Sequence, residues 1–217
     1  MSRHSAPDEL LLDYAAGALP EGPELAVAPH VALDPAARRT VDRLGALAGV
    51  LLDGENASAV DEVSLESMLA RLDGVKVEPR PAPVMRRPGF DWAPPALARY
   101  LEPGARWRSK LGGFEEIPLT MHADSHRVSL LRLEPGHGLP VHRHVGEELT
   151  VVLQGGFTDA TGSYGPGDFA VGPGAQEHEP IADAGEACIA LIVLEKPIVL
   201  TGPLGRWFNP LVRRGLI

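Results

Sequence analysis

Residues 136–156 read GHGLPVHRHVGEELTVVLQGG, a stretch with two histidines one residue apart, two adjacent glutamates and glycines at both ends. In an extended strand, alternate side chains point to the same face. A strand that runs through this stretch would place His142, His144 and Glu148 on one face and Glu147 on the other. The parity therefore predicts that Glu148, and not Glu147, accompanies the two histidines in a metal site.

A fourth donor has to come from another strand. His178, in a turn that follows the residues GDFAVGP, is the best candidate, and His137, in a glycine-flanked turn, is a weaker one. Three imidazoles and one carboxylate suit zinc, iron, manganese, nickel or copper, so the donor types alone do not select a metal. A lone His-x-His pair also occurs in ordinary exposed loops, and the hypothesis therefore depends on the residues around it.

The spacing of these residues resembles the two signature motifs of the cupin superfamily. The first motif is matched at Gly136, His142, His144, Glu148 and Gly155, and the second at Gly167, Pro173 and His178. Ala175 and Ala182 depart from the glycine and asparagine that are usual in the second motif. The resemblance covers residues 97–200 and implies that His142, His144, Glu148 and His178 hold one divalent metal inside a barrel.

The pattern of apolar residues divides the chain in two. In the first part the spacing of three to four positions predicts helices at 8–17, 21–33, 34–53 and 64–74, with Asp8 as a capping residue and Pro35 in a first turn. Prolines at 79, 81, 83, 88, 94 and 95 block helix after that. Alternating apolar runs then predict antiparallel strands at 127–135, 147–156, 167–173 and 186–195.

These patterns predict an α+β multidomain fold, in which a small helical domain precedes an antiparallel barrel or sandwich. The resemblance of the motifs implies that this all-β domain is a cupin barrel, also called a double-stranded β-helix or jelly roll. The expected division is a helical domain at 1–75, a proline-rich linker at 76–96, the cupin domain at 97–205 and a C-terminal tail at 206–217. Apolar stripes on the third and fourth helices predict a small helical core, with a partner surface as the alternative.

Composition narrows the function. The chain has 20 basic and 29 acidic residues and a net charge of −9, so direct binding to nucleic acid is not expected. It has neither a run of 18 apolar residues nor a signal-peptide pattern, and we expect a cytoplasmic protein without membrane association. Cys188 is the only cysteine, which excludes an internal disulfide; in its apolar strand it is expected to be buried and unreactive.

The segment LLLDYAAGAL at residues 10–19 is similar to the start of the ChrR-type anti-sigma factors, which join a short helical anti-sigma domain to a C-terminal cupin. The resemblance resumes in SLESMLARLDG at 64–74 and RWRSKLGG at 106–113, and it includes the metal motif. It implies that the helices bind and inhibit an extracytoplasmic-function sigma factor. It further implies that the metal-bound cupin, with zinc as the family's metal, senses or transmits an oxidative-stress signal such as singlet oxygen or an organic hydroperoxide.

One departure from this family concerns a second zinc site. The family's helical domain uses an early histidine followed by His-x3-Cys-x2-Cys, whereas this chain has His4 and then His30, Asp34 and Ala37. Without two thiolates, such a site would bind zinc much more weakly. We therefore expect no tightly held zinc among the helices, and we expect His4 and His30 to be surface or hydrogen-bonded core residues.

Two alternatives remain beside the anti-sigma hypothesis. The chain could be a metal-dependent cupin enzyme, a dioxygenase, hydrolase or isomerase with an accessory helical domain, because four protein ligands leave coordination positions open. No general base stands out, although His122, His126 and His137 are candidates. The helices could also serve only in dimerisation. The sequence leaves open which sigma factor is bound, which signal acts, whether iron, manganese or nickel replaces zinc, and whether the cupin domain forms a homodimer.

Overall fold

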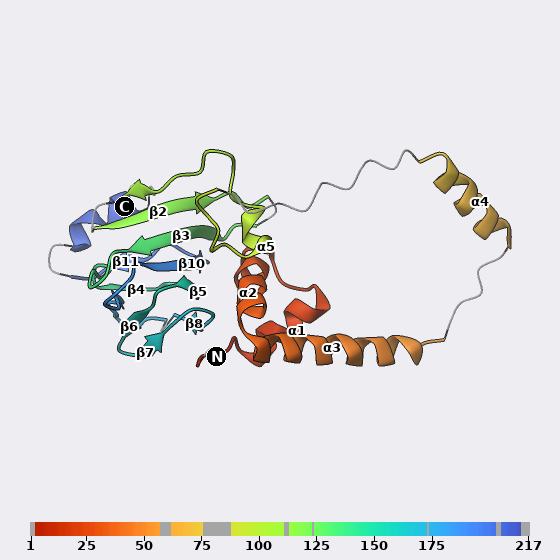
Figure 1. The fold of residues 1–217 in the computed structure, drawn as a ribbon, viewed down its shortest axis with the longest axis horizontal. Coiled ribbons are helices and arrows are strands. Elements are labelled where there is room, and N and C mark those ends of the chain that lie inside the picture. The colour runs from red at the N-terminus through yellow and green to blue at the C-terminus, as the bar shows by residue number, and fades with distance from the viewer. Residues whose placement is uncertain are drawn as a thin grey trace.

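The computed structural model describes residues 3–56, 62–75, 88–110, 113–122, 124–172, 174–202 and 205–213. Antiparallel sheets form a barrel, and helices from the N-terminal part cover the outer face of its largest sheet (Figure 1). The long helices are α1 (Asp8–Ala16), α2 (Glu21–Leu33), α3 (Pro35–Asp53) and α4 (Glu62–Asp73). All four predicted helices are therefore present, and each begins and ends within two residues of its predicted bounds.

Local sequence explains where these helices begin and end. The helix α1 begins after Pro7 without a side-chain cap, so the prediction that Asp8 caps it is wrong; Asp8 instead lies in the first turn, where a carboxylate favours the helix dipole. The helix ends at Gly17, which adopts φ +66°, a left-handed conformation that favours glycine. The side chain of Asp34 caps α3 by accepting hydrogen bonds from two backbone N–H groups of its first turn.

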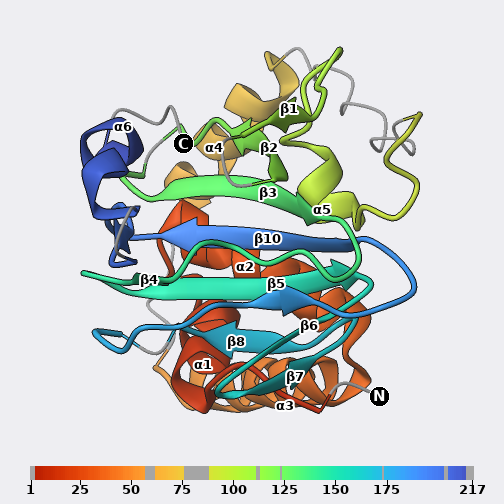
Figure 2. The same cartoon turned by 90° about the vertical axis from the view of Figure 1, so that its left-hand side faces the viewer.

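Six strands form the largest sheet, in the order β1-β2-β3-β10-β5-β8, and all neighbours are antiparallel (Figure 2). Their bounds are β1 (Arg108–Ser109), β2 (Phe114–Leu119), β3 (Arg127–Leu133), β5 (Glu148–Gln154), β8 (Phe169–Val171) and β10 (Cys188–Leu194). The opposite wall consists of β6 (Phe157–Asp159), β7 (Gly162–Tyr164) and β9 (Ile181–Ala182), with β4 (His142–Arg143) paired to β11 (Val199–Leu200).

Both faces of the central strands are buried. Odd-numbered residues of β5 and β10, such as Val151 and Leu191, pack against the helices in one apolar core that also contains Leu25 and Val27 of α2. Even-numbered residues of the same strands point into the barrel, where Cys188 is buried as predicted. This explains why the strands are nearly continuous apolar runs. The helices α1 to α3 and the barrel therefore share a core.

The predicted linker at 76–96 lies partly outside the described residues, which resume at 88. From there the chain packs against the common core through Phe90, Trp92 and Ala93, and a short helix α5 (Pro95–Ala98) buries Leu97 completely. At the other end, η1 (Gly205–Phe208) and α6 (Asn209–Arg213) follow the barrel, and the side chain of Asn209 bonds to the backbone of Leu200. The domain boundaries stay a prediction.

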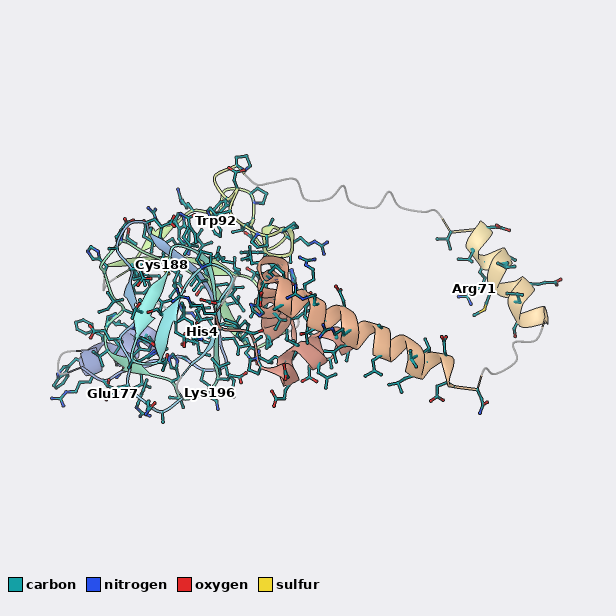
Figure 3. All side chains as sticks on the ribbon, turned by 60° about the horizontal axis from the view of Figure 1, so that its bottom comes forward. His4, Arg71, Trp92, Glu177, Cys188 and Lys196 are labelled. Carbon is teal, nitrogen blue, oxygen red and sulfur yellow. The ribbon has the colours of Figure 1, made fainter. Side chains whose placement is uncertain are left out.

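The apolar stripes of α3 and α4 are exposed, contrary to the predicted helical core. Only the first half of α3 packs on its neighbours, through Ala37, Val41 and Leu44. Seven large apolar side chains beyond it are 51% to 68% exposed: Leu47, Val50 and Leu51 of α3, and Leu65, Met68, Leu69 and Leu72 of α4. Figure 3 shows Arg71 of α4 far from Cys188 in the barrel. No helix among the described residues is long and apolar enough to span a membrane.

Candidate metal centre

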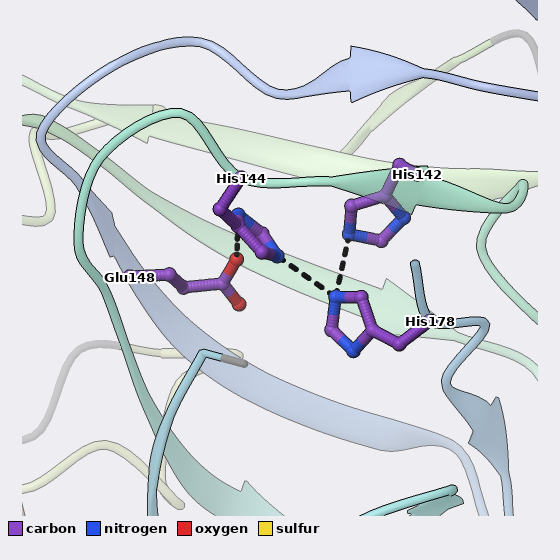
Figure 4. Close-up of side chains that lie close together, drawn as sticks. All are labelled: His142, His144, Glu148 and His178. Atoms are coloured by element: carbon purple, nitrogen blue, oxygen red, sulfur yellow. Dashed lines mark hydrogen bonds and ion pairs between the residues drawn. The ribbon is translucent and has the colours of Figure 1, made fainter. Parts of the chain in front are cut away.

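Four side chains meet inside the barrel (Figure 4). His142, His144 and Glu148 come from one short segment, and His178 comes from a segment that is distant in sequence. Each offers one donor atom, and these atoms all lie within 4.8 Å of one another. The three histidines are buried, and the Glu148 side chain is only 11% exposed. The structure thus brings together all four residues that the sequence predicts as ligands, on a scale that suits one coordinated ion.

His142, His144 and Glu148 do not lie on one continuous strand, contrary to what the parity argument assumed. His142 belongs to β4, which pairs with β11, whereas Glu148 begins β5, which pairs with β10. The intervening residues turn from one sheet to the other around Gly146, where a Cβ would lie 2.6 Å from the Glu195 carboxylate. Glu148 still joins the cluster and Glu147 is exposed, although the assumed strand is wrong. The role of Glu148 as a metal ligand stays a prediction.

Backbone pairing fixes the position of the fourth residue. His178 and His142 form an isolated antiparallel bridge, with N–H to O=C bonds of 3.2 and 3.0 Å in the two directions. This bridge places the two rings with their centroids 4.4 Å apart. Because the pairing is between segments thirty-six residues apart, local sequence could not specify it.

The hydrogen bonds of the rings define which nitrogens remain free. The Nδ1 of His142 donates to the carbonyl of Pro140 at 2.8 Å, and the Nδ1 of His178 donates to Oδ2 of Asp159 at 3.0 Å. In neutral rings these bonds leave both Nε2 atoms as acceptors, and they face each other across 3.0 Å. Two facing lone pairs repel, and a cation between them removes the repulsion. The donor set therefore fits a metal ion.

The remaining two candidate ligands, His144 and Glu148, lie against each other. The Nε2 of His144 lies 2.8 Å from that of His178, and its buried Nδ1 has no aligned hydrogen-bond partner although Oε2 of Glu148 is 2.8 Å away. The hydroxyl of Thr150 donates to Oε1 of Glu148 at 2.8 Å. A carboxylate oriented by a neighbouring hydroxyl is well placed to complete a cation site.

The electrostatics keep the ligands in the forms that bind metals. Burial lowers the pKa of His142 to about 4, so the ring is neutral at physiological pH. Burial alone would raise the pKa of Glu148, but the imidazoles of His144 and His142 and the hydroxyl of Thr150 bring it below its usual value. A neutral imidazole and an ionised carboxylate are the species that coordinate cations.

Sequence reasoning missed one residue of this centre, Asp159 in β6. Its Oδ2 accepts from His178, while its Oδ1 accepts from both the backbone N–H and the hydroxyl of Thr161. Metal-ligating histidines commonly donate their second nitrogen to a carboxylate in this way. The only signal in the sequence is an Asp at the start of the turn DATG, which by itself predicts a turn and nothing more.

The other histidines considered for this site lie outside the cluster. His137 is exposed, with Nδ1 near the carbonyl of Pro135, and His122 is also exposed. The ring of His126 contacts the Asp124 carboxylate at 2.6 Å, which in turn accepts from the backbone of Gly22 in α2. These contacts give no sign of catalytic roles.

The family's second zinc site does not fit this chain. The ring of His30 is fully buried, and both nitrogens are engaged: Nε2 accepts from the backbone N–H of Ala6 at 3.1 Å, and Nδ1 donates to the carbonyl of Gly167 at 2.8 Å. The Asp34 carboxylate caps α3, and the ring of His4 lies against the ring of Tyr164, tilted by 39°, at a centroid distance of 4.5 Å. A hydrogen bond of His30 thus joins α2 to the barrel at Gly167.

Comparisons with known proteins agree with this architecture. Residues 103–196 match the model of the ChrR cupin-like domain, which confirms the predicted α+β fold with a cupin barrel. The chain is 37% identical over 213 residues to the anti-sigma-E factor ChrR of Cereibacter sphaeroides, covering 97% of this chain and 98% of that protein.

A solved structure gives the same result. The crystal structure of Rhodobacter sphaeroides SigE in complex with the anti-sigma ChrR contains a chain that is 35% identical, with a TM-score of 0.73, covering 90% of this chain and all of that one. The match extends over the helices as well as the barrel and confirms the resemblance read from residues 10–19. The chain belongs to the ChrR family of anti-sigma factors.

Proposed function

We propose that this chain binds an extracytoplasmic-function sigma factor through its helices and keeps it from RNA polymerase, and that the metal-bound barrel relays an oxidative-stress signal that ends the inhibition. The partner class follows from the relatives, since the matching ChrR was crystallised with SigE. Because sigma factors act on RNA polymerase, the proposal places the protein in the cytoplasm.

The observation that carries the proposal is the exposure of the apolar residues of α3 and α4. Large apolar side chains that repeat along a helix and are more than half exposed typically mark a protein interface. Leu51 is 65% exposed and Leu69 is 52% exposed, although each lies on the apolar stripe of its helix. These stripes are exposed in the folded chain alone, and a bound sigma factor that covers them would bury them.

The metal part of the proposal assigns one divalent ion, zinc, to His142, His144, Glu148 and His178. Zinc has no redox chemistry, and three imidazoles with one carboxylate suit it. When bound, the ion would supply a positive charge between residues of β4, β5 and the segment before β9. A change at the metal centre would then reach the backbone through two residues of this chain. Glu148 connects the centre to β5, and His178 connects it to β4 through the bridge to His142.

Co-purification tests the sigma-binding proposal. The full chain with an affinity tag is co-expressed in turn with each extracytoplasmic-function sigma factor of its genome, and we expect one to be retained in equal amount. Leu51→Asp and Leu69→Asp are expected to lower the affinity for that sigma factor by at least about tenfold. Trp207→Asp, which alters a side chain 74% exposed on η1, is the matched control and should retain it.

Two outcomes would contradict the proposal: both helix variants bind the sigma factor as tightly as the wild type does, or the wild type retains no sigma factor. The metal is tested by elemental analysis of the purified full chain, with one zinc expected. Iron or nickel instead of zinc, together with turnover of a diketone or similar small substrate, would favour a cupin enzyme. That result would leave the sigma-binding measurement unchanged, so the two parts of the proposal are separable.

A further inference from the structure

The helix α2 lies between the other helices and the barrel, and its own sequence does little to stabilise it. It crosses the outer face of the large sheet behind β10 and β5 (Figure 2). Its N-cap residue, Pro20, makes no side-chain hydrogen bond, and Pro29 inside the helix has no backbone N–H to donate. The helix therefore depends on contacts with other segments of the chain.

The missing cap comes from the loop between β2 and β3. Oδ2 of Asp124 accepts a hydrogen bond at 2.6 Å from the backbone N–H of Gly22, which lies 102 residues away in sequence. In return, the Glu21 carboxylate accepts from the backbone N–H of His122 at 2.7 Å and from the hydroxyl of Tyr100 at 3.0 Å. The two segments thus cap each other, as two residues of one helix do in a capping box. This clamp on α2 is made by Glu21, Gly22, His122 and Asp124.

Close packing and charge fix the clamp in place. A Cβ on Gly22 would lie 2.9 Å from both Oδ2 of Asp124 and Cβ of His126, so only glycine lets α2 approach the barrel this closely. The Asp124 side chain is 4% exposed, and its Oδ1 accepts from the backbone N–H of His126 at 3.1 Å. Burial alone would raise the pKa of Asp124, but the hydrogen bonds from Gly22 and His126 lower it to about 2. A negative charge therefore faces the first turn of α2, where it favours the helix dipole.

The opposite end of α2 is attached to the barrel as well. Nδ1 of His30 donates to the carbonyl of Gly167 at 2.8 Å, and a Cβ on Gly167 would lie 3.3 Å from Cβ of Leu33, the last residue of α2. The helix in turn contacts α3, whose first half packs in the common core through Val41. The position of α3, and of the exposed stripe that contains Leu51, therefore depends on how the barrel holds α2.

We propose that Asp124 is a positioning residue for sigma binding: it caps α2 from the barrel, and the clamp on α2 is the contact through which the barrel sets the affinity of α3 for the sigma factor. The inference rests on the proposed sigma-binding function. It does not depend on the proposed metal, because none of the four clamp residues belongs to the candidate metal centre. It gives the barrel a part in the inhibition itself, in addition to the relay of a signal.

The test is a calorimetric titration of the full chain with the sigma factor that co-purifies with it. Asp124→Ala is expected to lower the affinity by about 2- to 30-fold, the equilibrium equivalent of a lost helix cap. Asp124→Asn keeps an oxygen that accepts from Gly22 and should recover most of this loss. Asp183→Ala removes a carboxylate that accepts from Thr158 in the opposite wall of the barrel, and as the matched control it should bind like the wild type. The zinc content should be the same in all of these proteins.

Gly22→Ala separates this role from a merely structural one. Alanine is a better helix former than glycine, so α2 considered alone would gain stability. The added Cβ collides with Asp124 and His126, and the clamp therefore predicts the opposite: a lower sigma affinity and faster hydrogen exchange at the backbone N–H of His122. If Asp124→Ala does not fold, the sign of the effect in Gly22→Ala decides.

Sigma affinities of Asp124→Ala and Gly22→Ala that equal the wild-type affinity would overturn the proposal. An equal loss of affinity in Asp183→Ala would do the same, because the effect would then not belong to the clamp. Either result, with the wild type binding its sigma factor, refutes only the role of Asp124. A wild-type chain that binds no sigma factor refutes the sigma-binding proposal and the role of the clamp together with it.

Discussion

The Nδ1 of His178 donates a hydrogen bond to Oδ2 of Asp159 across 3.0 Å, and this bond orients the ring toward the other three candidate ligands. Asp159 is therefore a positioning residue, and Asp159→Ala is expected to weaken zinc binding by about 10- to 100-fold. Competition with a chromophoric chelator measures this. Glu179→Gln alters an exposed carboxylate next to His178 in sequence and should leave the affinity unchanged. Equal zinc affinity in Asp159→Ala and wild type would show that the bond does not support the site.

The two adjacent glutamates provide a second prediction. Glu148→Gln is expected to lose stoichiometric zinc because the amide supplies no charge. His144→Ala and His178→Ala are expected to lose it because each removes an imidazole donor. Glu147→Gln, one residue away and exposed, should retain one zinc per chain. Elemental analysis after gel filtration distinguishes them, and the reverse result, with zinc lost only in Glu147→Gln, would refute the ligand assignment.

A third prediction concerns stability as a function of pH. Burial lowers the pKa of His30, against the opposing effects of the Gly167 carbonyl and the carboxylates of Asp34 and Asp168. The unfolded chain binds a proton at His30 near pH 6.5, whereas the folded chain does so only at lower pH. The unfolded state therefore gains protons first, and stability is lost as the pH falls below 6.5, until the folded pKa has been passed.

Urea denaturation of the wild type and His30→Gln between pH 5 and 8 measures this dependence. The variant should lose part of the pH dependence, since all other groups are unchanged. At pH 8 it should also be less stable, because the backbone groups of Ala6 and Gly167 lose well-fitted partners at a cost of roughly 1–3 kcal/mol each. Identical pH profiles for the two proteins would show that His30 does not titrate differently on folding.

The cap of α3 gives a fourth prediction. Asp34→Ala is expected to lower the free energy of unfolding by about 0.5–2 kcal/mol, because two backbone N–H groups lose their acceptor. Asp34→Ser supplies another good cap and should recover most of this loss. Thermal unfolding of the two variants in the presence of a chelator tests the role. A loss of zinc from Asp34→Ser, measured separately, would indicate that Asp34 is a ligand and not a cap.

Much of the fold follows from local patterns. The helices at 21–33 and 35–53 and the strands β3, β5, β8 and β10 lie where the apolar spacing and the turn residues predict them. Gly136 and Gly155, which the motif places at turns, both adopt positive φ, and a Cβ on Gly155 would lie 2.5 Å from the carbonyl of Ala187. These features depend on neighbours in sequence, and so sequence can predict them.

The rest depends on contacts between distant segments. Periodicity identifies an apolar stripe on α3 but does not tell whether its partner is the chain itself or another protein, and the exposure of Leu47 and Leu51 could not be predicted. Likewise, the pairing of His142 with His178 and the role of Asp159 arise from the packing of β4, β6 and the segment before β9. The sequence also did not predict that helices and barrel share a core. Both faces of β5 are apolar: one packs against the helices and the other lines the barrel, and the pattern alone does not say what covers each face.

The most direct test of the account is native mass spectrometry of the full chain co-expressed with its sigma factor. The account predicts a one-to-one complex with one zinc ion, which His178→Ala removes and His30→Gln retains. Two zinc ions per chain, loss of the ion in His30→Gln, or a mass that contains no sigma factor would contradict it.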